Sequence, residues 1–292
     1  MIPNNQILIH RDDLNHAQIS GNKLHKLKPS IAAAHKNGAD VLVSFGGPYS
    51  NHLHALAYAG HIHGFKTVGI IRGELQKKLT PTLVDCETWG MSLIGIPRSV
   101  FRLCRDKINY DSQSQALGDA TSLVPEFNYM HNAYLIPEGG SHQDAIISLK
   151  AAYQDILNRQ EYLDITHAVC ATGTGATVAG LSLAAPPNVK VLGIQAVAEG
   201  EATIERIRSW LNHRPSNLSI LPGHLGGFAK TPDRLLSFIA EFESQRDIPL
   251  DPIYNGKALF HLQHLFDNNY FKVDDRVLVI HTGGLQGRRS LD

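Results

Sequence analysis

Short runs of β-branched and other apolar residues alternate along this chain with segments of helical periodicity. This alternation is typical of an α/β protein with mainly parallel strands. We expect strands at residues 41–45, 67–71, 92–96, 133–136, 168–171, 189–194 and 277–280. We expect helices at residues 24–36, 51–63, 80–89, 145–158, 177–183, 232–244 and 257–267. The polar stretch 106–132 is the segment for which we expect irregular structure.

The composition of the 292 residues is that of a globular protein, with 43% hydrophobic and 18% charged residues. The 27 basic residues balance 27 acidic ones, which disfavours binding to nucleic acid or to an anionic membrane. No apolar run reaches the ~20 residues of a membrane helix, and the N-terminus lacks the pattern of a signal peptide. Three cysteines without CxxC spacing indicate reduced thiols. We therefore expect a cytoplasmic protein.

Residues 172–177 read Thr-Gly-Thr-Gly-Ala-Thr and lie between a predicted strand and an alanine-rich helix. The glycines let a ligand approach the backbone, and the N-terminus of the helix carries partial positive charge. Thr174 and Thr177 can add hydroxyl contacts to phosphate oxygens. The turn lacks the third glycine of a dinucleotide fingerprint and the Gly-Lys-Ser/Thr of a P-loop. It predicts a phosphate site, with a purely structural turn as the alternative.

Lys23 follows a Gly-Asn pair at the start of a predicted helix. A lysine that forms an imine with an aldehyde must be neutral part of the time, and burial or repulsion by Lys26 would lower its pKa. The alternative is an ordinary pair of solvated lysines. Ser50 and Asn51 stand at the start of the next predicted helix, where they could cap it or bind a ligand. An amine, a polar loop and a phosphate turn together suggest pyridoxal 5'-phosphate.

Histidines gather in one short region, at His52, His54, His61 and His63. Histidines two residues apart do not share one face of a helix, and His54 and His61 are seven residues apart. Acidic partners for a metal site are absent nearby. We expect no metal site and regard a zinc hydrolase as the weaker hypothesis.

Five motifs occur in an order that resembles one known family. They are Gly21-Asn22-Lys23, Gly46-Gly47-x-x-Ser50-Asn51, the turn at 172–177, the segment 251–257 (Asp-Pro-Ile-Tyr-Asn-Gly-Lys) and the segment 281–284 (His-Thr-Gly-Gly). The set is similar to the 1-aminocyclopropane-1-carboxylate (ACC) deaminase and D-cysteine desulfhydrase family, and the similarity runs from about residue 7 to the C-terminus. This resemblance implies the fold type II, or tryptophan synthase β, architecture of pyridoxal-phosphate enzymes. It implies two domains, each an open, twisted, mainly parallel sheet flanked by helices. We expect a large cofactor-binding domain at 1–35 and 136–292 and a small inserted domain at 36–135.

The resemblance also implies roles for individual residues. We expect catalytic roles for Lys23, Ser50 and Tyr254. We expect cofactor contacts from Lys23, Asn51, Thr172, Gly173, Thr174, Gly175, Ala176, Thr177 and Thr282. We expect substrate contacts from Tyr49, Ser50, Asn51 and His52. The implied assembly is a homodimer.

Two positions separate the branches of this family. ACC deaminases have a glutamate where this chain has Asn255 and a leucine where it has Thr282, and D-cysteine desulfhydrases resemble it at the second position. Phe228 and Ala229 stand in the region where ACC deaminases carry a second active-site tyrosine. We therefore expect an enzyme that abstracts the Cα proton of a small amino acid and eliminates a β substituent, giving a keto acid and ammonia. ACC deaminase is one alternative, and a cofactor- or ligand-binding relative without turnover is another.

Overall fold

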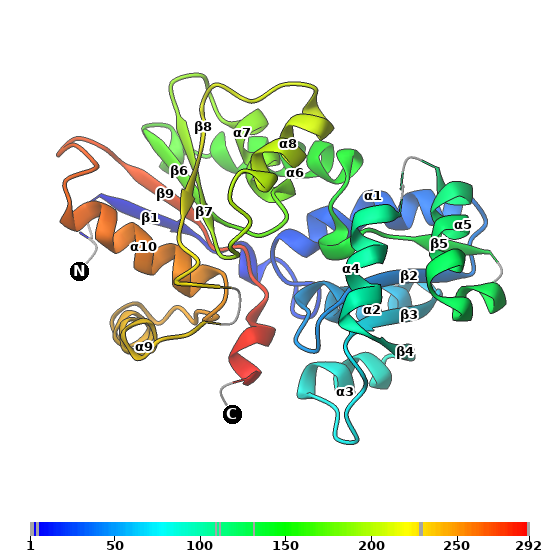
Figure 1. The fold of residues 1–292 in the computed structure, drawn as a ribbon. Coiled ribbons are helices and arrows are strands. Elements are labelled where there is room, and N and C mark those ends of the chain that lie inside the picture. The colour runs from blue at the N-terminus through cyan, green and yellow to red at the C-terminus, as the bar shows by residue number, and fades with distance from the viewer. Residues whose placement is uncertain are drawn as a thin grey trace.

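Two parallel β-sheets form two lobes that lie side by side (Figure 1). The structure is a computed structural model, and it describes residues 3, 6–108, 110, 112–130, 132–227 and 230–290. The larger sheet has the strand order β1-β9-β6-β7-β8, and the smaller has the order β4-β3-β2-β5. Every pairing between these strands is parallel. The expected α/β fold with two helix-flanked parallel sheets is confirmed, and the domain borders stay a prediction.

The larger sheet consists of β1 (Ile7–His10), β6 (His167–Thr172), β7 (Lys190–Gln195), β8 (Leu218–Pro222) and β9 (Val277–Ile280). The smaller sheet consists of β2 (Val41–Gly46), β3 (Lys66–Arg72), β4 (Met91–Ile96) and β5 (Ala133–Leu135). The helices around the smaller sheet are α1 (Asn22–Lys36), α2 (Asn51–His63), α3 (Pro81–Thr88), α4 (Arg98–Lys107) and α5 (Gln113–Leu123). Those around the larger sheet are α6 (Gln143–Leu157), α7 (Ala176–Ala184), α8 (Ala202–Leu211), α9 (Asp233–Arg246) and α10 (Asn255–Asp267). Short 3-10 turns are η1 (Asp12–Leu14), η2 (Pro125–Tyr129), η3 (Glu138–Gly140), η4 (Gln160–Tyr162) and η5 (Leu285–Ser290).

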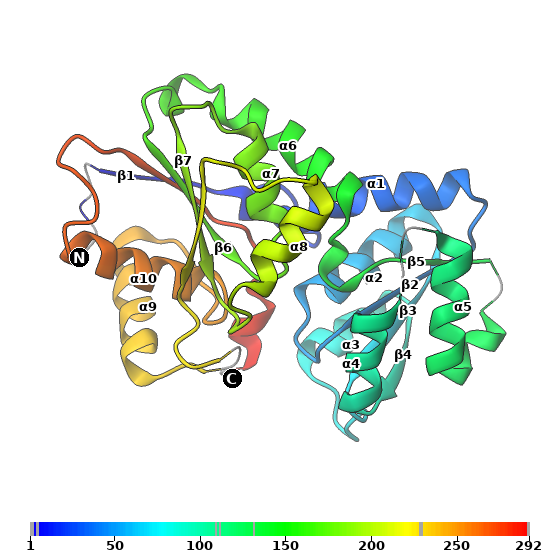
Figure 2. The ribbon, with the colours of Figure 1, turned by 45° about the horizontal axis from the view of Figure 1, so that its top comes forward.

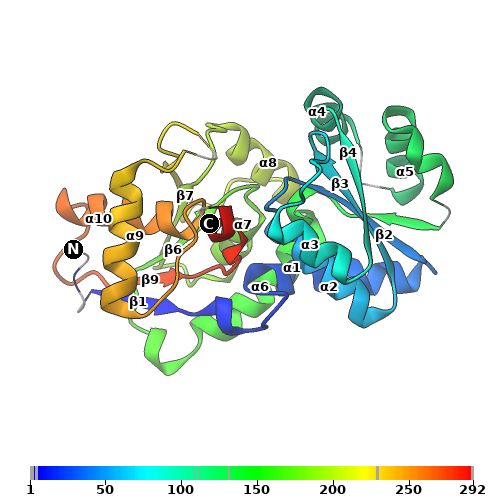
Figure 3. The ribbon, with the colours of Figure 1, turned by 90° about the horizontal axis from the view of Figure 1, so that it is seen from below.

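Each sheet is covered on both faces, as parallel sheets require because both of their faces are apolar. Buried side chains of α6, α7 and α8 pack on one face of the larger sheet, and those of α9 and α10 pack on the other (Figure 2). In the smaller lobe, α1, α2 and α3 form one layer and α4, α5 and η2 form the other (Figure 3). All six residues of β6 are buried, which is why that strand reads as a continuous apolar run.

All seven predicted strands and all seven predicted helices are present, with bounds that differ by two residues or fewer. The expectation of irregular structure at 106–132 is wrong, because this stretch holds the end of α4, the whole of α5 and η2. α5 buries only small residues, Ala116 and Ala120, and Ser112 caps it, so its apolar signal in the sequence is weak. The strands β1 and β8 and the helices α4 and α8 were not among the predicted elements. Both of these strands are edge strands of the larger sheet.

Candidate active site

Segments that follow the carboxyl ends of strands from both sheets come together between the lobes. In open parallel sheets this edge is where ligands bind. The segments are the start of α1 after β1, the start of α2 after β2, η3 after β5, the turn between β6 and α7, and the stretch after β9. Hydrogen bonds between side chains and backbone of these segments join them into one cluster, described below.

Lys23 lies in the first turn of α1, and this turn is pressed against the segment after β9. Gly21 precedes the helix with a φ of 67°, and a Cβ there would lie 1.9 Å from the carbonyl oxygen of Thr282. The backbone N–H of Asn22 donates to that same oxygen at 3.1 Å. Only glycine permits this approach, because a side chain would require the backbone of Thr282 to move. The position of Lys23 is therefore fixed relative to Thr282.

The amine of Lys23 has the lowered pKa that the sequence led us to expect, through burial rather than through repulsion by Lys26. Its Nζ donates a hydrogen bond to Oδ1 of Asn22 at 2.8 Å. Burial lowers the pKa of the Lys23 ammonium to about 8, and the charge of Asp251 opposes this shift. We expected repulsion by Lys26 to assist. Instead, burial and the charge of Lys23 lower the pKa of Lys26 well below its usual value.

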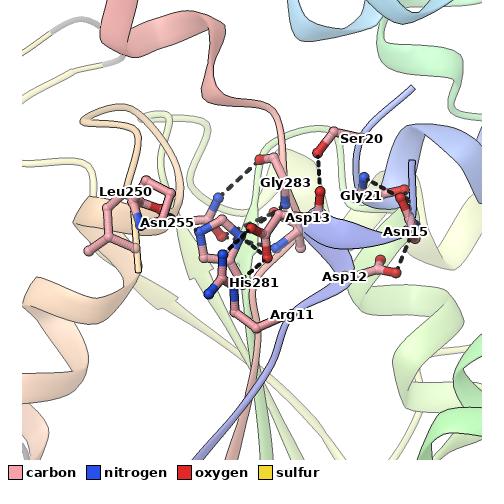
Figure 4. Close-up of polar contacts among 12 residues, drawn as sticks. Arg11, Asp12, Asp13, Asn15, Ser20, Gly21, Leu250, Asn255, His281 and Gly283 are labelled. Carbon is pink, nitrogen blue, oxygen red and sulfur yellow. Dashed lines mark hydrogen bonds and ion pairs between the residues drawn. The ribbon is translucent and has the colours of Figure 1, made fainter. Parts of the chain in front are cut away.

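A polar network beneath the first turn of α1 supports this arrangement (Figure 4). The side chain of Asn15 accepts a bond from the N–H of Gly21 at 2.9 Å and donates to the Gly21 carbonyl at 3.1 Å. Asp13 lies 3.3 Å from His281 and also accepts two bonds from Arg11. The network thus links the segment before α1 to the segment after β9.

The turn between β6 and α7 is joined to α1 by one side chain. Nδ2 of Asn22 donates to Oγ1 of Thr177 at 2.9 Å, while Oδ1 of the same amide accepts from Lys23. Gly175 precedes α7 with a φ of 104°, and no side chain among the described residues caps the helix. The first N–H groups of α7 are therefore available to an anion.

A buried amine lies at the other end of the same turn. Lys26 is 2% exposed, and its Nζ donates to Oγ of Ser141 at 2.8 Å. Ser141 in turn shares a hydrogen bond of 2.5 Å with Oγ1 of Thr174. An amine, two hydroxyls and a helix N-terminus form a donor set that suits the dianionic phosphate of pyridoxal 5'-phosphate. The residues present fit this cofactor.

The remaining residues of the turn lie as follows. A Cβ on Gly173 would be 3.1 Å from the ring of Tyr254, so the phenol packs over this glycine. Burial raises the pKa of Tyr254, which keeps its hydroxyl protonated. Ala176 begins α7 and is buried. The side chain of Thr172 points toward Gly193 of the neighbouring strand, since a Cβ on that glycine would lie 2.6 Å from its Oγ1.

The start of α2 comes from the smaller lobe. Ser50 is its N-cap and accepts a bond from the N–H of Leu53 at 3.2 Å. Asn51 accepts a bond from the N–H of Gln286 at 3.0 Å, so it touches the segment after β9. Tyr49 is 36% exposed. The expected capping contact of Ser50 is present. Because the Ser50 oxygen is the acceptor in this contact, the hydroxyl of Ser50 can still donate its hydrogen to another group.

His52 is buried at the junction of α2 and η3. Its Nε2 lies 2.8 Å from Oγ of Ser44, and Ser44 donates to the carbonyl of Ile136 at 2.7 Å. The Nδ1 atom of His52 is buried without a hydrogen-bond partner among the described residues. Burial, with the charges of Lys23 and Lys26, lowers the pKa of His52 well below its usual value. The imidazole is therefore neutral.

Thr282 is hydrogen-bonded to the side chain of Asn255. Its N–H and its hydroxyl both donate to Oδ1 of Asn255, at 3.1 and 3.2 Å. The amide nitrogen of Asn255 donates to Asp251 at 3.0 Å and to the Gly283 carbonyl at 3.1 Å (Figure 4). All the hydrogen-bonding groups of this amide are used. The first turn of α10 is thereby attached to the segment after β9.

Sequence reasoning missed a cleft of about 960 Å³ between α4 and α8. Ser141 and Thr174 line it, so it adjoins the phosphate donor set, whereas Lys23 is not part of its wall. Burial raises the pKa of Glu138, which also faces this cleft, although Arg72, Arg105 and Arg206 act against the shift. No periodic signal marks Glu138, Ser141 and Thr174, because they line the cleft from turns and loops.

The two C-terminal arginines are engaged with carboxylates. Arg288 contacts Glu243 and donates to the Leu250 carbonyl at 3.1 Å, and Arg289 contacts Asp85. Phe228 and Ala229, where we noted the missing phenol, lie outside the described residues. Within the described part of the chain, no helix is long and apolar enough to cross a membrane, and no group of three metal-binding side chains is found.

Comparison with known proteins gives matches over nearly the whole chain. The profile of a family described as pyridoxal-phosphate dependent enzyme matches residues 2–283. A protein from Pyrococcus horikoshii that is provisionally named 1-aminocyclopropane-1-carboxylate deaminase is 27% identical, over 96% of this chain and 85% of its own length. A D-cysteine desulfhydrase from Salmonella paratyphi A is also 27% identical, over 97% of this chain and 88% of its own.

Solved structures show the same fold. A crystal structure of an ACC deaminase homologue superposes with a TM-score of 0.78 at 25% identity, covering 96% of this chain and 85% of the other. A hydrogen sulfide-producing enzyme from Fusobacterium nucleatum has a TM-score of 0.63 at 13% identity, covering 97% and 91%. At that identity the second likeness concerns the fold alone.

Proposed function

The chain belongs to the pyridoxal-phosphate dependent enzymes, and on this premise we propose that it is a lyase that eliminates a β substituent from a small amino acid, as a D-cysteine desulfhydrase does. One observation carries the proposal. The amide of Asn22 joins the amine of Lys23 to Thr177 at the start of α7, at 2.8 and 2.9 Å. A reactive amine and a phosphate site therefore lie side by side, as the aldehyde and the phosphate of the cofactor require.

We propose the following places for the cofactor. Lys23 binds its aldehyde, and Lys26, Ser141, Thr174 and the N-terminus of α7 hold its phosphate. Thr282 and Asn51 contact its ring, as the resemblance implies. When bound, the cofactor withdraws electrons from the Cα of the amino acid attached to it.

The chain itself supplies the proton transfers. With a pKa of about 8, about one Lys23 amine in ten is neutral at pH 7, against roughly one in three thousand for an ordinary lysine. A neutral Lys23 can take the proton from Cα, and Asn22 holds it in place. Ser50, at the N-terminus of α2, can bind the substrate carboxylate. The protonated phenol of Tyr254 can donate to the departing group.

The amide at position 255 supports elimination from D-cysteine over ring opening of ACC. Asn255 donates to the buried carboxylate of Asp251 and accepts from Thr282. A glutamate at position 255, as ACC deaminases have, would place two carboxylates against each other here. Asn255 and Thr282, the side chains near the proposed cofactor ring, are thus neutral, and neutral groups would assist the more demanding ring opening less than a carboxylate would.

We expect purified protein with pyridoxal phosphate to release pyruvate and ammonia from D-cysteine, with a larger kcat/KM than for ACC. The measurement is a keto-acid assay over D- and L-amino acids with β leaving groups, with ACC in parallel and Lys23→Ala as control. A larger kcat/KM for ACC would assign the chain to the deaminase branch. Cofactor binding without any keto acid would indicate a binding protein and contradict the proposal.

We further propose a homodimer in the cytoplasm. The family resemblance supports the first, and the three buried, unpaired thiols of Cys86, Cys104 and Cys170 support the second. Light scattering after gel filtration measures the mass, and a monomer at micromolar concentration would refute the dimer.

A further inference from the structure

Lys257 is another buried lysine, distinct from Lys23 and Lys26 of α1. Lys257, in the first turns of α10, has no exposed surface. Its Nζ donates to the carbonyl oxygen of Gly227 at 2.8 Å and lies 3.4 Å from those of Ala196 and His224. Carbonyl oxygens that converge on one point bind a cation through their dipoles. The ammonium therefore occupies a cage of backbone oxygens.

The carbonyls belong to two different loops. Ala196 directly follows β7, and His224 and Gly227 lie in the loop after β8. These loops are neighbours, since the N–H of Gly223 donates to the carbonyl of Gln195 at 3.0 Å. Lys257 thus ties the carboxyl ends of two strands to the start of α10.

The start of α10 also carries residues of the proposed active site. Asp251 accepts bonds from the N–H groups of Ile253, Tyr254 and Asn255, and this fixes the turn before the helix. Burial lowers the pKa of Lys257 to about 8, while the charge of Asp251 raises it. The charge of Asp251 thus favours the ammonium form of Lys257.

We propose that Lys257 acts as a built-in monovalent cation, which holds the loops after β7 and β8 against α10 and so positions Tyr254 and Asn255 at the cofactor site. It is a positioning residue, because its ammonium faces the loops. The proposal uses the cofactor site of the proposed function, but it does not depend on which amino acid is turned over. If it holds, removing the side chain opens a site for potassium or ammonium, whose preferred ligands are such carbonyl oxygens.

The test compares Lys257→Ala with the native protein in potassium chloride, ammonium chloride and choline chloride at equal ionic strength. The readouts are the melting temperature without cofactor and the Kd for pyridoxal phosphate. For Lys257→Ala in choline we expect a lower melting temperature and an affinity weaker by about tenfold, or ~1.4 kcal/mol. Potassium or ammonium should restore most of both, whereas the native protein should respond equally to all three salts.

Two controls separate a specific site from a general salt effect. Lys257→Met fills the same space without charge and should not respond to potassium, and Lys36→Ala changes an exposed lysine and should behave as native. A folded Lys257→Ala with no preference among the cations would overturn the proposal, as would equal rescue of Lys257→Met. If Lys257→Ala does not fold, Lys257→Arg should bind the cofactor more tightly than Lys257→Met in choline. Equal binding by these two would show that the charge is not needed.

Discussion

At the scale of single residues, Asn22 joins three segments of the candidate site through its backbone and its side chain. Its N–H binds the Thr282 carbonyl, its Oδ1 accepts from Lys23, and its Nδ2 donates to Thr177. A carboxylate could accept from Lys23 but could not donate to Thr177, and a leucine could do neither. The Gly-Asn-Lys motif therefore combines a backbone requirement, at Gly21, with a requirement for an amide, at Asn22.

We predict that Lys23 is the lysine modified by the cofactor. Borohydride reduction followed by peptide mapping should find the pyridoxyl group on Lys23, and Lys23→Ala should keep cofactor affinity only through the phosphate. Because the neutral amine is the nucleophile, the rate of attachment should rise with pH and level off above a pH of about 8. Modification of Lys26 or Lys230 would show that the assignment is wrong.

The sequence identified the chemistry of this residue but not its surroundings. Lys23 and the turn at 172–177 were selected because local motifs suggest their roles. Lys26 and Ser141 were not selected as ligands, since their hydrogen bond joins parts of the chain that are 115 residues apart. Such contacts depend on the packing of α1 against η3 and α6, which one sequence does not reveal.

At the scale of elements, the turn before α7 shows why substitutions of Gly175 and of Thr177 should differ in their effect on cofactor binding. Gly175 has a φ of 104°, and a Cβ there would lie 3.1 Å from Ile207 of α8. Arg206 of α8 also donates to the Thr174 carbonyl at 3.0 Å and pairs with Glu199 at 2.8 Å. The helix α8 thus supports the turn from outside, and any side chain at position 175 would push the two apart.

We predict that Gly175→Val weakens cofactor binding far more than Thr177→Ala. Valine is strained at this φ and contacts α8, whereas alanine removes one hydroxyl and its bond to Asn22, worth about 1 kcal/mol or roughly fivefold in Kd. Fluorescence titration of apoprotein with pyridoxal phosphate measures both affinities. Gly38→Ala, at a positive φ in open space, is the control for backbone strain alone. Small and equal effects at 175 and 177 would place the phosphate elsewhere.

Several elements that sequence reasoning missed have a weak apolar signal. β1 and β8 are edge strands, with one neighbour each, and β8 is only partly buried. α5 packs through two alanines, so its buried face carries little apolar signal. The central strands and the long helices were predicted because burial on both faces, or along one broad stripe, forces a regular apolar pattern.

At the scale of the whole molecule, the proposed cofactor site uses residues of both lobes. Lys26 and Ser141 approach it from the elements between the sheets, Thr174 from the larger lobe and Asn51 from the smaller. The C-terminal turn η5 adds a second link, because Asn51 binds the N–H of Gln286 and Arg289 contacts Asp85 of α3. A ligand at this position should therefore stabilise the lobes together.

The chain has two tryptophans, one in each lobe, and they allow this coupling to be measured. Trp89 follows α3 and packs on His54 and Tyr58, and Trp210 lies in α8.

Saturation at a hundred times Kd stabilises a protein by about 2.7 kcal/mol, which corresponds to roughly 5–10 °C in a chain of this size. We predict that pyridoxal phosphate raises the fluorescence melting temperature by this amount in both Trp89→Phe and Trp210→Phe. Inorganic phosphate at the same concentration should give a smaller rise, because it reaches only the donor set around Lys26. A rise seen by Trp210 but not by Trp89 would mean that the cofactor is held by the larger lobe alone.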